Sequence, residues 1–301
     1  MPAPMPVIVN AAAGKGHRSG EVAALEQLFR DAGTPARVMP ARTNLEIREF
    51  ARRAAKENPA VIVAGGGDGT MNCVASVLVG TDINLGILPL GTLNHFAKDL
   101  GIPLDLNAAV GVIAAGRQRR VDVGEVNGKI FLNNSSLGLY PDIVRNRELL
   151  RRRTGAGKWP ALLWASWTVM RRSPFLNVRV RFEDEEREYR APAVFIGNNV
   201  YVAEGFSIGS REHLDGDVLS LYTTIRRGRR ALLGLVIRAL FGLLHQARDF
   251  EARTAHTIDV ETRRQHVKVA IDGEVSVLQS ALHYRIRAGA LRVIVPDSKE
   301  P

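Results

Sequence analysis

The chain has 301 residues, of which 46% are hydrophobic and 24% charged, so the composition excludes wholesale disorder and predicts a folded globular protein. This length favours two domains, each able to bury a core. A formal net charge of +10 favours anionic partners, such as a nucleotide, nucleic acid or a membrane surface, without choosing among them.

Residues 1–125 alternate short β-branched runs with amphipathic helical patterns, which predicts an α/β domain with layers around a mostly parallel sheet. Strands are predicted at 7–10, 60–64 and 83–88 within a sheet of at least four. Helices are predicted over 22–32, from Thr43 to just before Asn58, and over 71–79, 93–100 and 105–116. Thr43 and Glu46 have the spacing of a capping box at the start of the second helix.

After Arg119 the pattern becomes antiparallel, and Asn127-Gly128 is a two-residue hairpin signal between strands predicted at 121–126 and 129–133. Further strands are predicted at 176–182, 187–197, 217–225, 256–261, 266–271, 274–278, 282–287 and 291–295. These strands predict a mainly antiparallel β-sandwich domain over residues 126–289. Two helical insertions are predicted at 158–172 and 229–247, and neither is long and apolar enough for a clean membrane span.

The run Gly-Gly-Gly-Asp-Gly-Thr at residues 65–70 joins a predicted buried strand to a predicted helix. A phosphate needs hydrogen-bond donors and a close approach of the backbone, which glycines at a helix N-terminus supply. Asp68 within the run would repel phosphates unless it binds Mg²⁺ or orients a nucleophile. A single loop of this kind is equally an ordinary strand-to-helix turn.

Two further loops, at residues 10–16 and 89–94, follow other predicted strands. In an open α/β sheet, loops at the carboxyl ends of the strands meet at one ligand crevice. The spacing of Gly14-Lys15-Gly16 is not that of a Walker motif, and residues 65–70 do not form the dinucleotide-binding fingerprint, which disfavours a dehydrogenase. The sequence therefore predicts one phosphate-binding site made of three loops.

GGGDGTMNCV followed by LPLGTLNHFAKDLGIP resembles the diacylglycerol kinase catalytic-domain family, in its branch of soluble bacterial lipid kinases related to sphingosine kinases. NAD kinases share a shorter Gly-Gly-Asp-Gly-Thr loop and are a more distant resemblance, since the second motif favours the lipid-kinase branch. The resemblance continues through residues 122–124, 131–133, 198–199 and 271–274, and so covers nearly the whole chain.

The resemblance implies that a nucleotide binds in a cleft between the two domains, and that residues 290–301 return to the first domain. It implies that Glu274 is the general base and that Asp68 and Asp122 organise metal and phosphates. The residues implied to contact ATP are Asn10, Gly14, Thr43, Gly66, Gly67, Asp68, Gly69, Thr70, Asn72 and Thr92. From the residues alone, Glu274 is a surface residue next to a type I′ turn and Asp122 a polar residue on an exposed strand face.

A structural Mg²⁺ site with the pattern Asp-Asp-Gly-x-Leu-Asp is common in the family, and here the matching residues begin at Asp215. The second and third residues of the pattern are exchanged, giving Gly216 and Asp217, and Ser220 replaces the last aspartate. The resemblance thus points to Asp215 and Asp217, together with Asp68, as metal ligands, and the departures put the structural site in question.

Arginine runs flank two apolar segments, one with Trp159, Trp164 and Trp167 and the other following Arg226 to Arg230. Such runs either form solvated protein surfaces or bind the protein to an anionic membrane surface, where it would encounter a lipid substrate. No zinc-finger, RNP or basic-heptad pattern is present, so no nucleic-acid partner is expected. The sequence leaves a homo-oligomer open.

Cys73 is the single cysteine, so no intramolecular disulfide can form, and the N-terminal residues lack a signal-peptide pattern. We therefore expect a cytoplasmic protein that is peripherally bound to a membrane. The sequence favours an ATP- and Mg²⁺-dependent kinase that phosphorylates a lipid hydroxyl, with diacylglycerol as the default acceptor and phosphatidic acid as the product. The alternatives are a kinase of a soluble acceptor such as NAD, and a catalytically inactive regulator that binds lipid or nucleotide.

Overall fold

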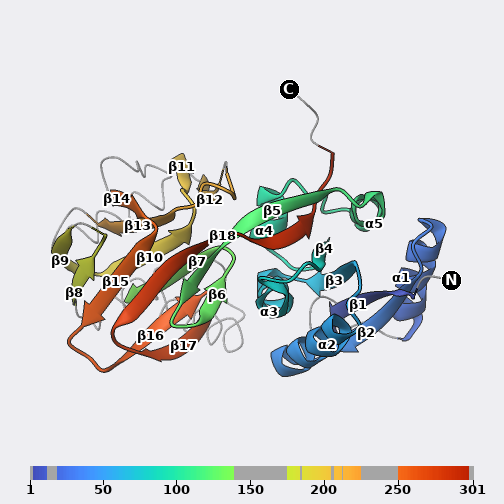
Figure 1. Cartoon of the computed structure of the whole chain (residues 1–301), viewed down its shortest axis with the longest axis horizontal. Coiled ribbons are helices and arrows are strands. Elements are labelled where there is room, and N and C mark those ends of the chain that lie inside the picture. The colour runs from blue at the N-terminus through green and yellow to red at the C-terminus, as the bar shows by residue number, and fades with distance from the viewer. Residues whose placement is uncertain are drawn as a thin grey trace, which may run out of the picture. The chain divides into compact units, whose positions relative to one another are not determined.

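A computed structural model describes residues 3–11, 19–138, 175–183, 185–204, 207–211, 213–224 and 250–297. The chain divides into two compact units, one of residues 1–123 with 287–301 and the other of residues 124–286. Two strands, β5 (Gln118–Val126) and β18 (Leu282–Ile294), contribute residues to both units. Figure 1 labels the elements, and each unit is described separately below.

The first unit is built on a parallel sheet with the strand order β2-β1-β3-β4-β18, and β5 pairs with β18. The strands are β1 (Met5–Asn10), β2 (Ala36–Ala41), β3 (Val61–Gly66), β4 (Asn84–Pro89) and the final part of β18. The helices are α1 (Ser19–Asp31), α2 (Asn44–Lys56), α3 (Asp68–Leu78), α4 (His95–Asp99) and α5 (Leu106–Ala115). Residues 6–9 of β1, residues 62–66 of β3 and all of β4 are buried, as expected for parallel strands with both faces covered.

Two details of this unit differ from the sequence prediction. Helix α3 begins at Asp68 rather than Met71, because the Gly67 carbonyl already accepts hydrogen bonds from the N–H groups of Thr70 and Met71. Strand β2 was not predicted, because its sequence includes Pro40, although its residues alternate between buried and exposed as in a strand with one covered face. A proline is tolerated there because β2 ends the order of the parallel sheet and one of its sides has no partner strand among the described residues.

The second unit is an antiparallel sandwich. One sheet has the order β14-β13-β10-β7-β16-β17, and the facing strands are the first part of β18 followed by β15, β8 and β9. A hairpin of β5 and β6 (Lys129–Phe131) and a short pair of β11 (Val202–Glu204) and β12 (Ser207–Ser210) accompany them. The other strands are β7 (Asn134–Gly138), β8 (Leu176–Arg181), β9 (Glu186–Ala191), β10 (Ala193–Asn198), β13 (Leu219–Thr224), β14 (Phe250–Ala255), β15 (Thr257–Thr262), β16 (His266–Ile271) and β17 (Glu274–Gln279).

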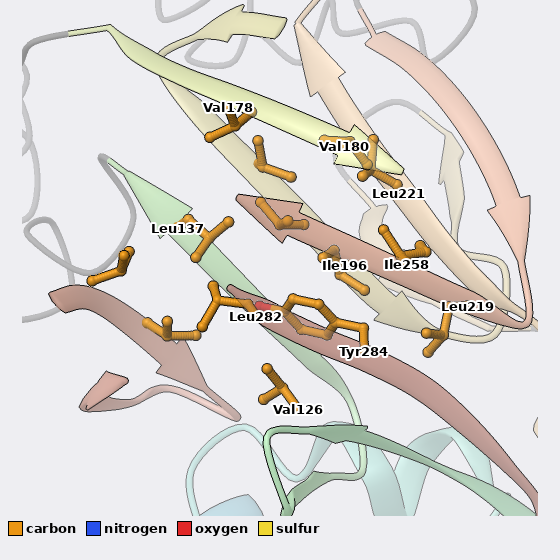
Figure 2. Close-up of a cluster of buried hydrophobic side chains, with 14 of the residues drawn as sticks. Val126, Leu137, Val178, Val180, Ile196, Leu219, Leu221, Ile258, Leu282 and Tyr284 are labelled. Carbon is orange, nitrogen blue, oxygen red and sulfur yellow. The ribbon is translucent and has the colours of Figure 1, made fainter. Parts of the chain in front are cut away.

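Alternate residues of the two sheets form the core of the sandwich, as Figure 2 shows for Leu137, Ile196 and Leu221 against Val180 and Tyr284. Burial raises the pKa of the Tyr284 phenol, although its 3.0 Å hydrogen bond with the Ser135 hydroxyl acts in the opposite direction. The predicted fold class, an α/β domain followed by an antiparallel sandwich, is confirmed.

Two strand boundaries after residue 126 were predicted wrongly. The segment 187–197 is two strands, β9 and β10, which are separated at Pro192 because proline cannot donate to the ladder. The segments predicted as strands at 282–287 and 291–295 are a single strand, β18, that continues through Gly289 at φ +53°. Glycine adopts this backbone angle without the steric cost that another residue would meet, so the strand is not ended there.

The tryptophan-containing segment 158–172, the apolar segment 229–247 and the arginine runs beside them lie outside the described residues. Within the part of the chain that the structure describes, no helix has the length and apolar character needed to cross a membrane.

Candidate functional site

Four parallel strands of the first unit end at one edge of the sheet, and the predicted phosphate loops start there. Asn10 lies opposite Ala41, and Gly66 lies opposite Pro89, so the last residues of β1, β2, β3 and β4 are lateral neighbours. The segments that follow these strands carry Thr43, residues 67–70 and Thr92. The structure therefore brings most of the residues implied to bind ATP to the same carboxyl edge.

Gly66, where β3 leads into the loop, packs so closely against Thr70 that no larger residue fits there. A Cβ atom on Gly66 would lie 2.3 Å from the Thr70 Oγ1 atom, far inside contact distance. The Thr70 hydroxyl accepts a 3.2 Å hydrogen bond from the Asn10 amide, which ties the end of β1 to the first turn of α3. The N-terminal turn of α3 is thereby fixed next to the sheet edge, where its N–H groups suit a phosphate.

The loop after β4 is bonded directly to the loop after β3. The N–H groups of Leu90 and Gly91 both donate to the Gly66 carbonyl, at 3.0 and 3.1 Å. Asn94, which adopts a left-handed conformation at φ +52°, closes this second loop by accepting from the Gly91 N–H and donating to the Pro89 and Gly91 carbonyls. The two motifs of the sequence thus form one interlocked backbone surface.

Asp68 joins the same two loops through its side chain. Its carboxylate oxygens accept hydrogen bonds from the His95 N–H at 3.2 Å and the Phe96 N–H at 3.0 Å, which are the first N–H groups of α4. Asp68 therefore has a structural role in addition to the predicted chemical one. An ionised carboxylate has about four acceptor positions, so these bonds are compatible with a Mg²⁺ ligand.

Replacing Gly91 by alanine is expected to separate the two loops. A Cβ atom there would lie 2.4 Å from the Gly67 Cα atom, and a backbone clash of this kind costs roughly 1–3 kcal/mol. We expect a lower melting temperature and a Kd for ATP raised about tenfold, measured by thermal denaturation and calorimetric titration. Gly111→Ala is the matched control because that position is open, and an effect of similar size there would contradict this explanation.

The remaining residues that were predicted to contact the nucleotide differ in position and in burial. Thr43 is exposed and is the N-cap of α2, where its hydroxyl accepts from the Glu46 N–H at 3.2 Å, as the capping box predicts. Gly69 and Asn72 lie half-buried in the first two turns of α3, and Thr92 is exposed. Gly14 and Lys15 lie outside the described residues.

Asp122 lies elsewhere in the first unit. It is buried on β5, and one of its carboxylate oxygens accepts from the Gly289 N–H at 2.8 Å. The next residue, Ala290, accepts from the Gly80 N–H just before β4 begins, whereas the phosphate loops follow the end of β4. The structure therefore places Asp122 and the interlocked loops toward opposite ends of β4, and the catalytic role of Asp122 stays a prediction.

In the second unit, the turn that carries Glu274 is anchored by its neighbour Asp272. The Asp272 carboxylate accepts three backbone hydrogen bonds, from Leu132 at 2.8 Å, Asn133 at 2.8 Å and Asn134 at 3.0 Å. Asp272 and Gly273 have φ values of +45° and +84°, as a type I′ turn requires. Glu274 is the first residue of β17 and is exposed, so its carboxylate sits on an anchored turn.

A buried arginine that the sequence analysis did not single out supports the same segment from its other side. The guanidinium of Arg211 donates to the Leu132 carbonyl at 2.7 Å, the Asn198 carbonyl at 3.1 Å and the Asn133 side chain at 2.8 Å. Arg211 is only 5% exposed. Its position after a short strand gives no periodic signal, so only the fold reveals that it is buried.

The residues predicted to hold a structural Mg²⁺, Asp215 and Asp217, lie in a loop with several hydrogen bonds of its own, and their role as metal ligands stays a prediction. The Ser220 hydroxyl donates to the Asn199 carbonyl at 2.5 Å, and the Gly216 N–H donates to the Asn199 side chain at 2.9 Å. The Asp217 carboxylate lies 3.8 Å from the His256 ring nitrogen. Among the described residues, no three acidic, histidine or cysteine side chains form a group that could hold a metal. Hydrogen bonds within the protein close this loop.

Chelation of divalent cations is accordingly expected to leave the melting temperature of the protein unchanged. A metal present at 100 times its Kd would contribute about 2.7 kcal/mol, which a thermal melt would report as a shift of several degrees. Melting curves in EDTA and in excess Mg²⁺, both without nucleotide, make the comparison. A fall in melting temperature in EDTA that Mg²⁺ reverses would contradict the expectation.

The chain is similar to known proteins over both units. The family model for the diacylglycerol kinase catalytic domain matches residues 4–126. A Pseudomonas aeruginosa (strain PAO1) protein named Probable lipid kinase YegS-like is 30% identical over 298 residues, which cover 94% of this chain and 92% of the relative. A Klebsiella pneumoniae (strain 342) protein of the same name is 30% identical over 208 residues, or 68% of each chain.

Among solved structures, the fold is similar to that of a candidate diacylglycerol kinase from Bacillus anthracis str. Sterne. The TM-score is 0.76 at 23% sequence identity, and the match covers 98% of this chain and 97% of the other. At this identity the likeness concerns the fold alone.

Proposed function

Because this chain belongs to the diacylglycerol kinase catalytic-domain family of YegS-like lipid kinases, we propose that it phosphorylates a lipid hydroxyl with ATP and Mg²⁺. The proposed acceptor is diacylglycerol and the product phosphatidic acid. The observation that carries the proposal is the interlocked pair of loops, in which the Gly66 carbonyl accepts from both Leu90 and Gly91.

The proposed phosphate side is the carboxyl edge of the first unit. Gly66, Gly67 and Gly91 let the two loops pack directly against each other, and the start of α3 presents its N–H groups at that edge. Asp68 is the carboxylate fixed there and is the proposed ligand for Mg²⁺. When bound with ATP, Mg²⁺ neutralises charge on the β- and γ-phosphates.

The proposed acceptor side is Glu274. In the transfer, the lipid hydroxyl oxygen forms a bond to the γ-phosphorus, the bond from that phosphorus to the bridging oxygen breaks, and ADP leaves. The Glu274 carboxylate accepts the hydroxyl proton. Asp272 supports this role by holding the preceding turn through three backbone N–H groups, since a general base acts only within hydrogen-bond reach of the proton.

A lipid acceptor is favoured over a soluble one by the strand that begins at Glu274. On β17, Val275 and Val277 are 39% and 60% exposed, and both lie on the same side of the strand. These exposed valines, on the strand face opposite to that of the Glu274 side chain, offer apolar contact to an acyl chain. The net charge of +10 supports our further proposal that the enzyme attaches peripherally to an anionic membrane on its cytoplasmic side.

The test is a labelling assay with purified protein, Mg²⁺ and γ-labelled ATP, in mixed micelles of diacylglycerol with NAD present as a competing acceptor. The expected result is label in phosphatidic acid and none in NADP. Label in NADP would identify a kinase of a soluble acceptor, and tight ATP binding without turnover across several lipids would identify an inactive regulator. Either outcome would overturn the proposal.

A further inference from the structure

The segment 132–134, which follows the β5–β6 hairpin, is held by hydrogen bonds from two sides. Its three N–H groups donate to the Asp272 carboxylate. Its opposite side is held by Asn198, whose amide donates to the Leu132 carbonyl at 2.8 Å, and by Arg211. Together these contacts tie one short piece of backbone to three different strands or loops of the second unit.

Arg211 and Asn198 each make two of the hydrogen bonds on that second side, since the Asn198 N–H also donates to the Asn133 carbonyl at 2.9 Å. One of the Arg211 nitrogens, Nη1, donates to the Leu132 and Asn198 carbonyls, and the other, Nη2, donates to the Asn133 side chain. The guanidinium also lies over the Tyr201 ring, 5.4 Å from the ring centroid. Burying a cation costs free energy unless its donors are hydrogen-bonded. The Arg211 guanidinium meets this condition, so its acceptors hold it in one fixed position.

A short chain of contacts connects Arg211 to Glu274, the proposed base. Arg211 holds the Leu132 carbonyl and the Asn133 side chain, and the N–H groups of residues 132–134 hold the Asp272 carboxylate. Asp272 is followed by Gly273 and then by Glu274. A displacement of the 132–134 backbone would therefore be passed to the turn, and with it to the Glu274 carboxylate.

We propose that Arg211 is a positioning residue for Glu274, acting through the segment 132–134 and Asp272. The inference rests on the proposed function, in which Glu274 is the general base. A lysine cannot replace the planar fork, because its ammonium donates from a single point and would leave one of the three acceptors without its partner. A misplacement of about 1 Å at a reacting group costs roughly a hundredfold in rate.

The experiment measures kcat for phosphorylation of diacylglycerol in four proteins: wild type, Arg211→Lys, Glu274→Gln and the double variant. We expect Arg211→Lys to lower kcat about 10- to 100-fold in the wild-type background, with KM for ATP unchanged. In the Glu274→Gln background we expect no further loss, because there is no base left to misplace. Arg285→Lys is the matched control, since Arg285 pairs with Glu125 at 2.7 Å and is largely exposed.

The outcomes separate the two proposals. An arginine that only stabilises the fold would lower the melting temperature and reduce kcat by the same factor in both backgrounds, which would overturn the positioning role. Unchanged kcat in Arg211→Lys would also overturn it. Wild-type kcat in Glu274→Gln would instead overturn the proposed base. If Arg211→Lys does not fold, Asn133→Ala removes the acceptor of Nη2 and takes its place in the cycle.

Discussion

Glu274→Gln is expected to lower kcat for lipid phosphorylation by about 10²- to 10⁴-fold, the range for loss of a general acid–base group. The amide has the size of the carboxylate but cannot take the hydroxyl proton. The melting temperature should not change, because Glu274 is exposed and the turn before it is set by Asp272 and Gly273. The Kd for ATP should also be unchanged, since the proposed phosphate contacts lie in the first unit.

The measurements are steady-state kinetics in mixed micelles, a thermal melt and a calorimetric titration with ATP. Glu261→Gln serves as the control, because Glu261 is a half-exposed carboxylate on β15 of the same unit, 4.0 Å from Arg181. The control should keep wild-type kcat. A Glu274→Gln enzyme within about threefold of wild type would show that another group, or water, takes the proton, and would remove Glu274 from the mechanism.

Features encoded by neighbouring residues could be predicted from the sequence. The capping box places Thr43 at the start of α2, with the Glu46 side chain accepting from the Arg42 N–H. The Asn127-Gly128 hairpin has the positive φ values of +46° and +79° that its sequence predicts. Both signals are local, because the hydrogen bonds and backbone angles that they require lie within four residues.

Features that depend on distant contacts could not be predicted. Arg211 resembles any surface arginine in sequence, and its burial depends on Leu132 and Asn133, which are 79 and 78 residues away. Asp122 reads as a polar residue on an exposed strand face, yet it is buried and bonded to a residue 167 positions later. Local patterns cannot report such contacts, because the partners are brought together only by the pairing of strands.

The proposed phosphate site could be predicted from the sequence only in part. That loops at strand ends would gather follows from the parallel topology, and the structure bears this out for residues 66–70 and 89–94. That Gly66 would accept from both Leu90 and Gly91, and that Asp68 would bind the start of α4, does not follow from any pattern. The sequence therefore indicates where phosphates would bind, and the structure adds how the two loops are held together.

Asp68→Asn is expected to lower kcat for lipid phosphorylation by about 10²- to 10³-fold, the range for loss of one preorganised electrostatic contact to a transition state. The Mg²⁺ concentration for half-maximal activity should rise, because an amide oxygen is a weaker ligand than a carboxylate. The melting temperature should fall moderately, since the amide would turn an N–H group toward the His95 or Phe96 N–H and lose one of the two bonds.

Asp105→Ala separates the structural part of this effect from the chemical part. Asp105 caps α5 by accepting from the Ala108 N–H at 2.9 Å, as Asp68 accepts from the start of α4. Loss of a cap of this kind costs about 1 kcal/mol. The Asp105 variant should therefore show a similar fall in melting temperature with wild-type kcat and Mg²⁺ dependence. If Asp68→Asn also kept its Mg²⁺ dependence, Asp68 would act only by joining the two loops, and the Mg²⁺ ligand would have to be another group.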